Sequence, residues 1–277
     1  MKKLLYIILM GFFIIACEDV IELETPTGET RINIDAHFRV FTQEEPIRAT
    51  GRVVLTETVN FFDDNIPAVS NATVTITERE SGTIYPFVEA TPGTGIYEST
   101  DLLFLNDFDA MFDLHVEADG EVYSASAQPI RSAPILEIQQ GDLEIFGEED
   151  LELIVTISDT AGIENYYLFD FGFNLYQPLD DQFFDGNEFE FSFLYTEDDE
   201  VNLQPGDVVT VINDGVDEQF FTYMELLLEQ TDSGGFFSSP PTTARGNVIN
   251  QANPDAYPLG YFRISEAFTL NYTVQED

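Results

Sequence analysis

The sequence has one cysteine, no tryptophan, and ten basic residues against 52 acidic ones. One cysteine cannot form a disulfide within the chain, so burial of apolar side chains must stabilise the fold. The 25 phenylalanines and 12 tyrosines make such burial feasible. The formal net charge of -42 repels phosphate groups, which excludes nucleic acid as a partner.

Histidine is also scarce, and this limits the chemistry that the chain can perform. His37 and His115 are the two histidines, and each falls on the polar face of an alternating segment, so we expect both to be solvated. A Ser-His-Asp triad or a histidine metal centre has little to build on, and no glycine-rich phosphate-binding motif occurs. Carboxylates alone can hydrolyse glycosides, but spacing does not identify a pair among so many acids. We therefore predict no catalytic residue, no metal ligand and no cofactor.

The N-terminus has the features of an exported protein. Lys2 and Lys3 precede an apolar run over residues 4–16 that is too short to span a membrane, as in a secretory signal peptide. The lone Cys17 follows, and residues 14–17 resemble the lipobox of bacterial lipoproteins. This resemblance implies that Cys17 is lipidated and becomes the mature N-terminus. We expect a signal peptide over 1–16, an acidic tether over 17–29, and membrane association through the lipid.

A two-residue alternation of apolar and polar side chains predicts a β protein. We expect an immunoglobulin-like antiparallel β-sandwich over 30–131, followed by a second antiparallel β domain over 135–277. Residues 32–40 alternate most clearly, and Asp119-Gly120 and Ser81-Gly82 predict hairpin turns. The second domain contains an aromatic segment at 166–195, which we interpret mainly as core.

One amphipathic helix is expected near 217–230 in the second domain. Its apolar residues recur at helical spacing, and Asp214 or Asp217 can cap it: the stripe is Phe220, Tyr223, Met224, Leu227 and Leu228. The loop that follows is predicted mainly to close the core and, alternatively, to dock a partner. Its candidate docking residues are Phe236, Phe237, Pro240 and Pro241.

Clusters of oxygen ligands leave a calcium site open as an alternative. Such clusters occur at 106–109, 198–200 and 213–217. None has the twelve-residue spacing of a calcium-binding loop, so solvated loops are the preferred interpretation.

The order of several segments resembles a known family. They include residues 17–23, 31–35, 206–211, the Phe-Phe-Ser-Ser-Pro-Pro loop at 236–241, Gly-Asn-Val-Ile-Asn at 246–250 and Leu-Gly-Tyr-Phe at 259–262. The chain resembles the outer-membrane lipoproteins of Bacteroidota known as domain of unknown function 4249, which are often encoded beside TonB-dependent receptors. The resemblance implies a location in the outer membrane and a gene neighbourhood that includes a TonB-dependent receptor, but it implies no activity. Gly246 and Gly260 are expected to mark tight backbone geometry.

We therefore expect a non-enzymatic lipoprotein of the outer membrane, exposed at the cell surface. Glu18 and Asp19 resemble the export signal that directs lipoproteins of this phylum to the surface. The leading hypothesis is an accessory or ligand-presenting partner of a TonB-dependent transporter. The alternative is a cell-surface binding module or adhesin for calcium, peptide or glycan.

Overall fold

The computed structural model describes residues 28–60, 63, 65–142, 151–196, 199, 201–231 and 243–276. Two sets of predicted functional residues lie outside this part of the chain, and the predictions about them stay predictions: Cys17, Glu18 and Asp19 at the N-terminus, and Phe236, Phe237, Pro240 and Pro241 in the predicted loop. Within the described residues, no helix has the length and apolar character needed to cross a membrane.

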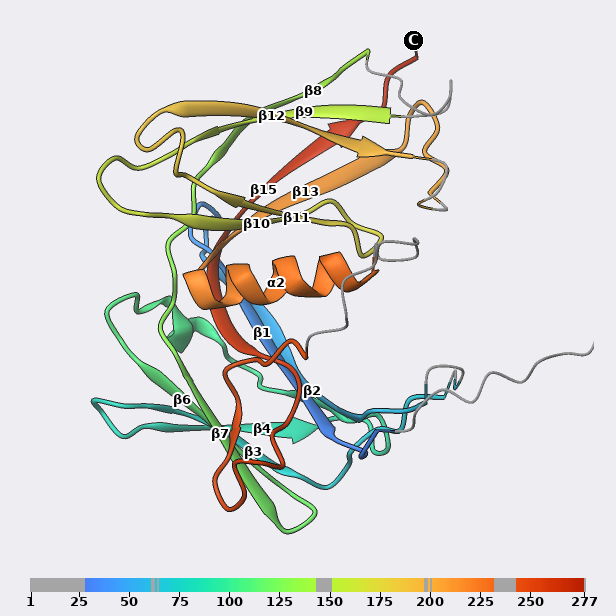
Figure 1. The fold of residues 1–277 in the computed structure, drawn as a ribbon. Helices are drawn as coiled ribbons and strands as arrows, with labels where there is room; N and C mark the ends of the chain where they lie inside the picture. The colour runs from blue at the N-terminus through green and yellow to red at the C-terminus, as the bar shows by residue number, and fades with distance from the viewer. Residues whose placement is uncertain are drawn as a thin grey trace, which may run out of the picture.

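The described chain is mainly β, as predicted, and contains one α-helix (Figure 1). The strands are β1 (Ile32–Phe41), β2 (Arg48–Glu57), β3 (Thr73–Glu78), β4 (Ile84–Glu89), β5 (Ile96–Glu98), β6 (Phe112–Ala118), β7 (Glu121–Ala127), β8 (Ile135–Gln140), β9 (Leu151–Ser158), β10 (Tyr166–Asp170), β11 (Tyr176–Asp180), β12 (Glu188–Tyr195), β13 (Val208–Val216), β14 (Ile249–Asn250) and β15 (Phe262–Thr273). The helices are the 3-10 turn η2 (Leu103–Asn106) and α2 (Glu218–Thr231).

Strands β1 to β7 enclose a first hydrophobic core. The alternation in β1 buries Ile34, Ala36, Phe38 and Val40, while the residues between them face away from this core. Strands β6 and β7 form the predicted hairpin, with Asp119 and Gly120 both at positive φ, as a two-residue turn requires. Strands β3 and β4 form the other predicted hairpin.

A second core lies between two layers in the later part of the chain. Strands β12, β9 and β8 form a three-stranded sheet, which packs against β10, β13 and the end of β15. The predicted aromatic core is confirmed: Phe171 stacks on Phe193 with ring centroids 3.8 Å apart, and Phe169 packs on Phe191. Phe173 and Phe183 are exceptions, since their side chains are exposed.

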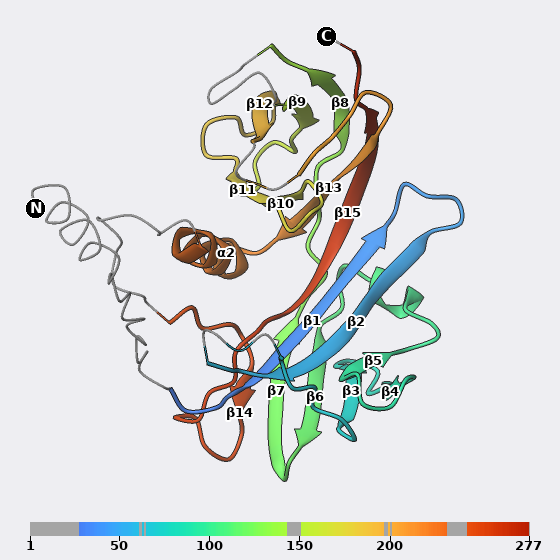
Figure 2. The same ribbon diagram turned by 90° about the vertical axis from the view of Figure 1, so that its right-hand side faces the viewer.

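Strand β15 connects the two cores (Figure 2). Its first half pairs in parallel with β1, from Ala36 opposite Phe262 to Val40 opposite Glu266, and its second half pairs antiparallel with β13. Phe262 and Ile264 therefore belong to the first core, whereas Leu270 packs against the second. This pairing joins the strands into a twelve-stranded sheet, in the order β11-β10-β13-β15-β1-β2-β5-β4-β3-β6-β7-β14. The parallel pair was not predicted, and the boundary near residues 131–135 stays a prediction.

Helix α2 lies beside β10 and β11, near the point where β1, β13 and β15 meet (Figures 1 and 2). Of the two predicted caps, Asp217 takes this role: its Oδ1 accepts a hydrogen bond of 2.7 Å from the Phe220 amide. Phe220 then packs against Leu168, Val216 and Tyr261 in a small third cluster. The helix thus covers the polar face of the β1, β13 and β15 junction.

Candidate functional site

A buried ionic cluster lies at the junction of β1, β13 and β15. Asp214 of β13 is fully buried, and its carboxylate accepts hydrogen bonds from the guanidinium groups of Arg39 and Arg263. The Arg39 Nε and Nη2 atoms each lie 2.8 Å from an Asp214 oxygen, and the Arg263 nitrogens lie 3.2 Å from Oδ2. Arg39 also donates to Asp170 at 2.8 Å. The cluster therefore ties four strands, β1, β10, β13 and β15, together by charge-assisted hydrogen bonds.

The charges within this cluster balance. Burial alone would raise the pKa of the Asp214 carboxyl, but the two guanidinium groups hold that pKa well below its usual range. Asp214 and Asp170 are thus the counter-ions of Arg39 and Arg263. Neither arginine of the cluster is left with an uncompensated charge.

His37 belongs to this cluster, so the prediction that it is a solvated surface histidine is wrong. Its side chain is 28% exposed, and its Nδ1 lies 3.2 Å from Nη2 of Arg263. Because Arg263 can only donate, Nδ1 accepts and Nε2 carries the proton. Nε2 lies 3.6 Å from Asp214 and makes no hydrogen bond. His115, in contrast, is exposed as predicted.

The position of His37 predicts a pH-dependent stability. Burial, and then the charge of Arg263, lower the pKa of His37 from 6.5 to about 4. As the pH falls, His37 is therefore protonated in the unfolded chain before it is protonated in the folded protein. The stability that His37 contributes is complete above about pH 6.5 and is lost as the pH falls towards 4. We expect His37→Gln, which keeps an acceptor but cannot titrate, to flatten the fall in melting temperature across this window. His115→Gln should follow the wild type; identical profiles for all three proteins would contradict the assignment.

A cavity of about 260 Å³ lies beside the ionic cluster and below α2. Its polar lining consists of Asn33, Asp35 and His37 from β1 and Arg263 from β15. Its aromatic lining consists of Tyr176, Phe220, Tyr223 and Tyr261, and Leu168, Met224 and Leu227 complete the apolar wall. We call this cavity the α2 pocket. It combines a charged floor with apolar walls, which is the usual composition of a small-molecule site.

Gly260 is required where the pocket meets β1. Its φ is +91°, and a Cβ at this position would collide with the backbone carbonyl of Ile34. A Cβ on Gly246 would in turn collide with the carbonyl of Gly260. The predicted tight geometry of both glycines is therefore confirmed.

Asp35 is the carboxylate of the α2 pocket. It makes no hydrogen bond or ion pair with any of the described residues, although it remains accessible from the cavity. Burial raises the pKa of its carboxyl, whereas the charges of Arg263 and Arg52 oppose this rise. Asp35 is thus an exposed acid at the edge of the pocket, with no hydrogen-bonded counter-ion among the described residues.

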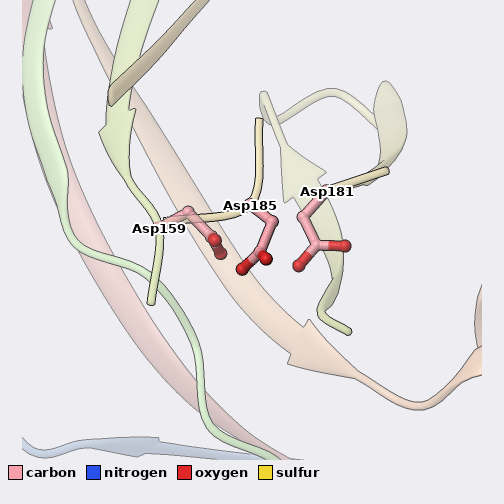
Figure 3. A group of neighbouring side chains, drawn as sticks. All are labelled: Asp159, Asp181 and Asp185. Carbon is pink, nitrogen blue, oxygen red and sulfur yellow. The ribbon is translucent and has the colours of Figure 1, made fainter. Parts of the chain in front are cut away.

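A separate group of acids lies at the far end of β9 and β11. Oxygen atoms of Asp159, Asp181 and Asp185 lie within 4.8 Å of one another (Figure 3). It is the one group with metal-ligand geometry among the described residues. The carboxylates also support the local turns, because Asp159 accepts from the Gly186 amide, Asp185 from Gly162 and Asp181 from Asn165. The sequence did not single out this group, since its members lie on two separate turns, Asp159 after β9 and Asp181 and Asp185 between β11 and β12.

The acidic loops weighed as calcium ligands have other contacts. Asp214 neutralises the two arginines, and Asp217 caps α2 and accepts from the Tyr261 hydroxyl. Asp107 accepts from the amide of Asp109 within its own loop. Of the cluster at 198–200, only residue 199 lies in the described part of the chain. The oxygen-rich sequences at 106–109 and 213–217 are thus engaged in local structure.

One known family model matches almost the whole length of the chain. The model of the domain of unknown function DUF4249 matches residues 19–270. The chain belongs to this family. No curated protein matches the chain. The matched residues include the ionic cluster, the α2 pocket and most of both cores, but the family name assigns no activity to them.

Proposed function

We propose that this DUF4249 protein is a non-enzymatic lipoprotein of the outer membrane that binds a ligand in the α2 pocket and presents it to a TonB-dependent transporter. The observation that carries the binding role is the α2 pocket itself. It is a concave site with aromatic walls, and two of its polar groups, His37 and Arg263, are held in place by the ionic cluster. The cavity is already present in the structure, so we propose that a ligand binds without a conformational change.

The composition of the pocket supports binding rather than catalysis. The described residues that line it include no serine, threonine or cysteine, so none of them offers His37 a hydroxyl or thiol nucleophile. They include one carboxylate, whereas glycoside hydrolysis uses two across the scissile bond. His37 is further engaged by Arg263 through the nitrogen that would act as a base.

The location of the proposed activity is supported by the sequence. The short apolar run before Cys17 supports a lipid anchor, and Glu18 and Asp19 support display at the cell surface. The resemblance to Bacteroidota lipoproteins supports a transporter as the partner. Phe236, Phe237, Pro240 and Pro241 are its proposed docking residues.

A cell-surface binding module or adhesin without a transporter is the second candidate. The acidic group of Asp159, Asp181 and Asp185 favours the calcium-binding form of this candidate, because Ca²⁺ prefers carboxylate oxygens. The two candidates share the anchor and differ in the partner.

The anchor is tested by Cys17→Ala in the full chain. A single acyl chain holds a protein weakly and two hold it stably, so the wild type should stay with membranes in high salt. We expect the variant to be released into the soluble fraction or to remain unprocessed, as measured by fractionation and by mass spectrometry of the N-terminus. His115→Ala is the control and should fractionate as the wild type does. Equal membrane retention of Cys17→Ala in high salt would refute the anchor.

A further inference from the structure

We infer that the α2 pocket binds an organic cation, an ammonium or guanidinium group of side-chain size, with Asp35 as its counter-ion and Phe220, Tyr223 and Tyr261 as its aromatic wall. This inference rests on the proposed function, because it assigns a ligand class to the same pocket. The source of the cation is either a free small amine or the lysine or arginine side chain of a peptide.

The charge of the pocket selects for a cation. Arg263 uses its Nη atoms on Asp214, Ser265 and His37, and its side chain is 9% exposed. It is therefore a poor anchor for an anion. Asp35 makes no hydrogen bond or ion pair with the described residues, although the charges of Arg263 and Arg52 attract it. Its exposed carboxylate is therefore the acidic group of the pocket that is available to pair with a cation.

The aromatic wall reinforces this selection. The ring centroids of Phe220 and Tyr261 are 4.9 Å apart, and those of Tyr223 and Tyr261 are 5.4 Å apart. The faces of such rings attract cations, most strongly where water is excluded. The protein already uses one of them in this way, because the guanidinium carbon of Arg263 lies 4.6 Å from the centroid of Phe220. Burial, together with the charge of nearby Asp35, raises the pKa of Tyr223 to about 12, so this ring stays neutral and next to the acid.

Size and long-range charge agree with the same ligand class. The volume of about 260 Å³ is below the range of roughly 300 to 1,000 Å³ typical of drug-sized ligands, which suits one alkyl-ammonium or alkyl-guanidinium group. The net charge of -42 raises the local concentration of cations and repels anions. A small cation is therefore both attracted to the protein and accommodated by the pocket.

The inference is tested by calorimetric titration of the full lipidated protein in detergent micelles. The free probes are n-butylguanidine and n-butylamine, with n-pentanol and n-pentanoate as neutral and anionic analogues. We expect both cations to bind and both analogues to bind at least ten-fold more weakly. A Gly-Gly-Arg-Gly-Gly amide distinguishes the sources: tighter binding than n-butylguanidine indicates a peptide side chain, and weaker binding indicates a free amine.

Two substitutions locate the site. Asp35→Asn removes the counter-ion with little change in shape, and we expect cation affinity to fall at least ten-fold. Asp109→Asn removes the same charge from an exposed loop outside the pocket and should leave affinity unchanged. Tyr223→Leu should lower the affinity for the two cations more than the affinity for n-pentanol, because it removes the aromatic ring but keeps an apolar side chain. Melting curves show that each variant is folded.

The outcomes separate this inference from the proposed function. Binding of n-pentanol or n-pentanoate as tightly as the cations, or cation binding unaffected by Asp35→Asn, overturns the ligand class and leaves the pocket as a binding site. Absence of binding by every probe, including the peptide, overturns both the ligand class and the role of the pocket. Neither result bears on the lipid anchor.

Discussion

Replacing Asp214 with alanine is expected to lower the free energy of unfolding by about 3 to 5 kcal/mol, the usual cost of removing one partner from a buried ionic pair. The reason is that Arg39 and Arg263 would keep their buried charges without the carboxylate that now compensates them. Urea denaturation of the full chain measures this loss. Because the folded-state pKa of Asp214 is depressed, its contribution is present above the ordinary aspartate pKa and is lost as the pH falls below it.

Asp113→Ala is the matched control for this experiment. Asp113 also pairs with an arginine, Arg79, but both side chains are substantially exposed. Surface pairs contribute about 1 kcal/mol or less, so this control should change little. Equal effects of Asp113→Ala and Asp214→Ala would show that the cluster at the strand junction does not stabilise the fold.

Phe262→Ala is expected to cost about 3 to 5 kcal/mol, as truncation of a buried phenylalanine usually does. Phe262 is fully buried and its ring lies 6.2 Å from that of Phe38, although the two residues belong to opposite ends of the chain. The substitution thus tests whether β15 completes the core of the N-terminal strands. Urea denaturation gives the loss, and Phe183→Ala, at an 89% exposed side chain, is the control that should change little.

The interaction energy between the two rings can be measured separately. A double-mutant cycle of Phe38→Ala and Phe262→Ala should give an interaction energy of about 0.5 to 1.5 kcal/mol for the edge-to-face pair. Additive effects, with no coupling, would contradict the packing of the Phe262 ring on the Phe38 ring.

The sequence predicted the local parts of the fold because their signals are local. Alternation located β1, and Asp119-Gly120 located the turn between β6 and β7. The apolar stripe beginning at Phe220 located α2. In each case the residues that determine the element are neighbours along the chain.

The site was not predicted, because it depends on which strands become neighbours. Alternation places His37 and Arg39 on the polar face of β1, but it does not show that β15 and β13 follow β1 in the sheet or that α2 lies over that face. His37 was therefore assigned to solvent, and Asp214 to a helix cap or a calcium loop. Arg263 carried no signal either, because it stands at a polar position between Phe262 and Ile264 in the alternating strand β15, where an exposed arginine would also stand.

The most direct test of the proposed function is to identify what the native, lipidated protein binds in its own membrane. The protein is purified through a C-terminal tag from membranes washed in high salt, and its partners are quantified by mass spectrometry against Cys17→Ala. We expect a TonB-dependent transporter in near-stoichiometric amount with the wild type and its loss with the variant. Recovery of the wild type without any transporter, from membranes in which that transporter is abundant, would contradict it.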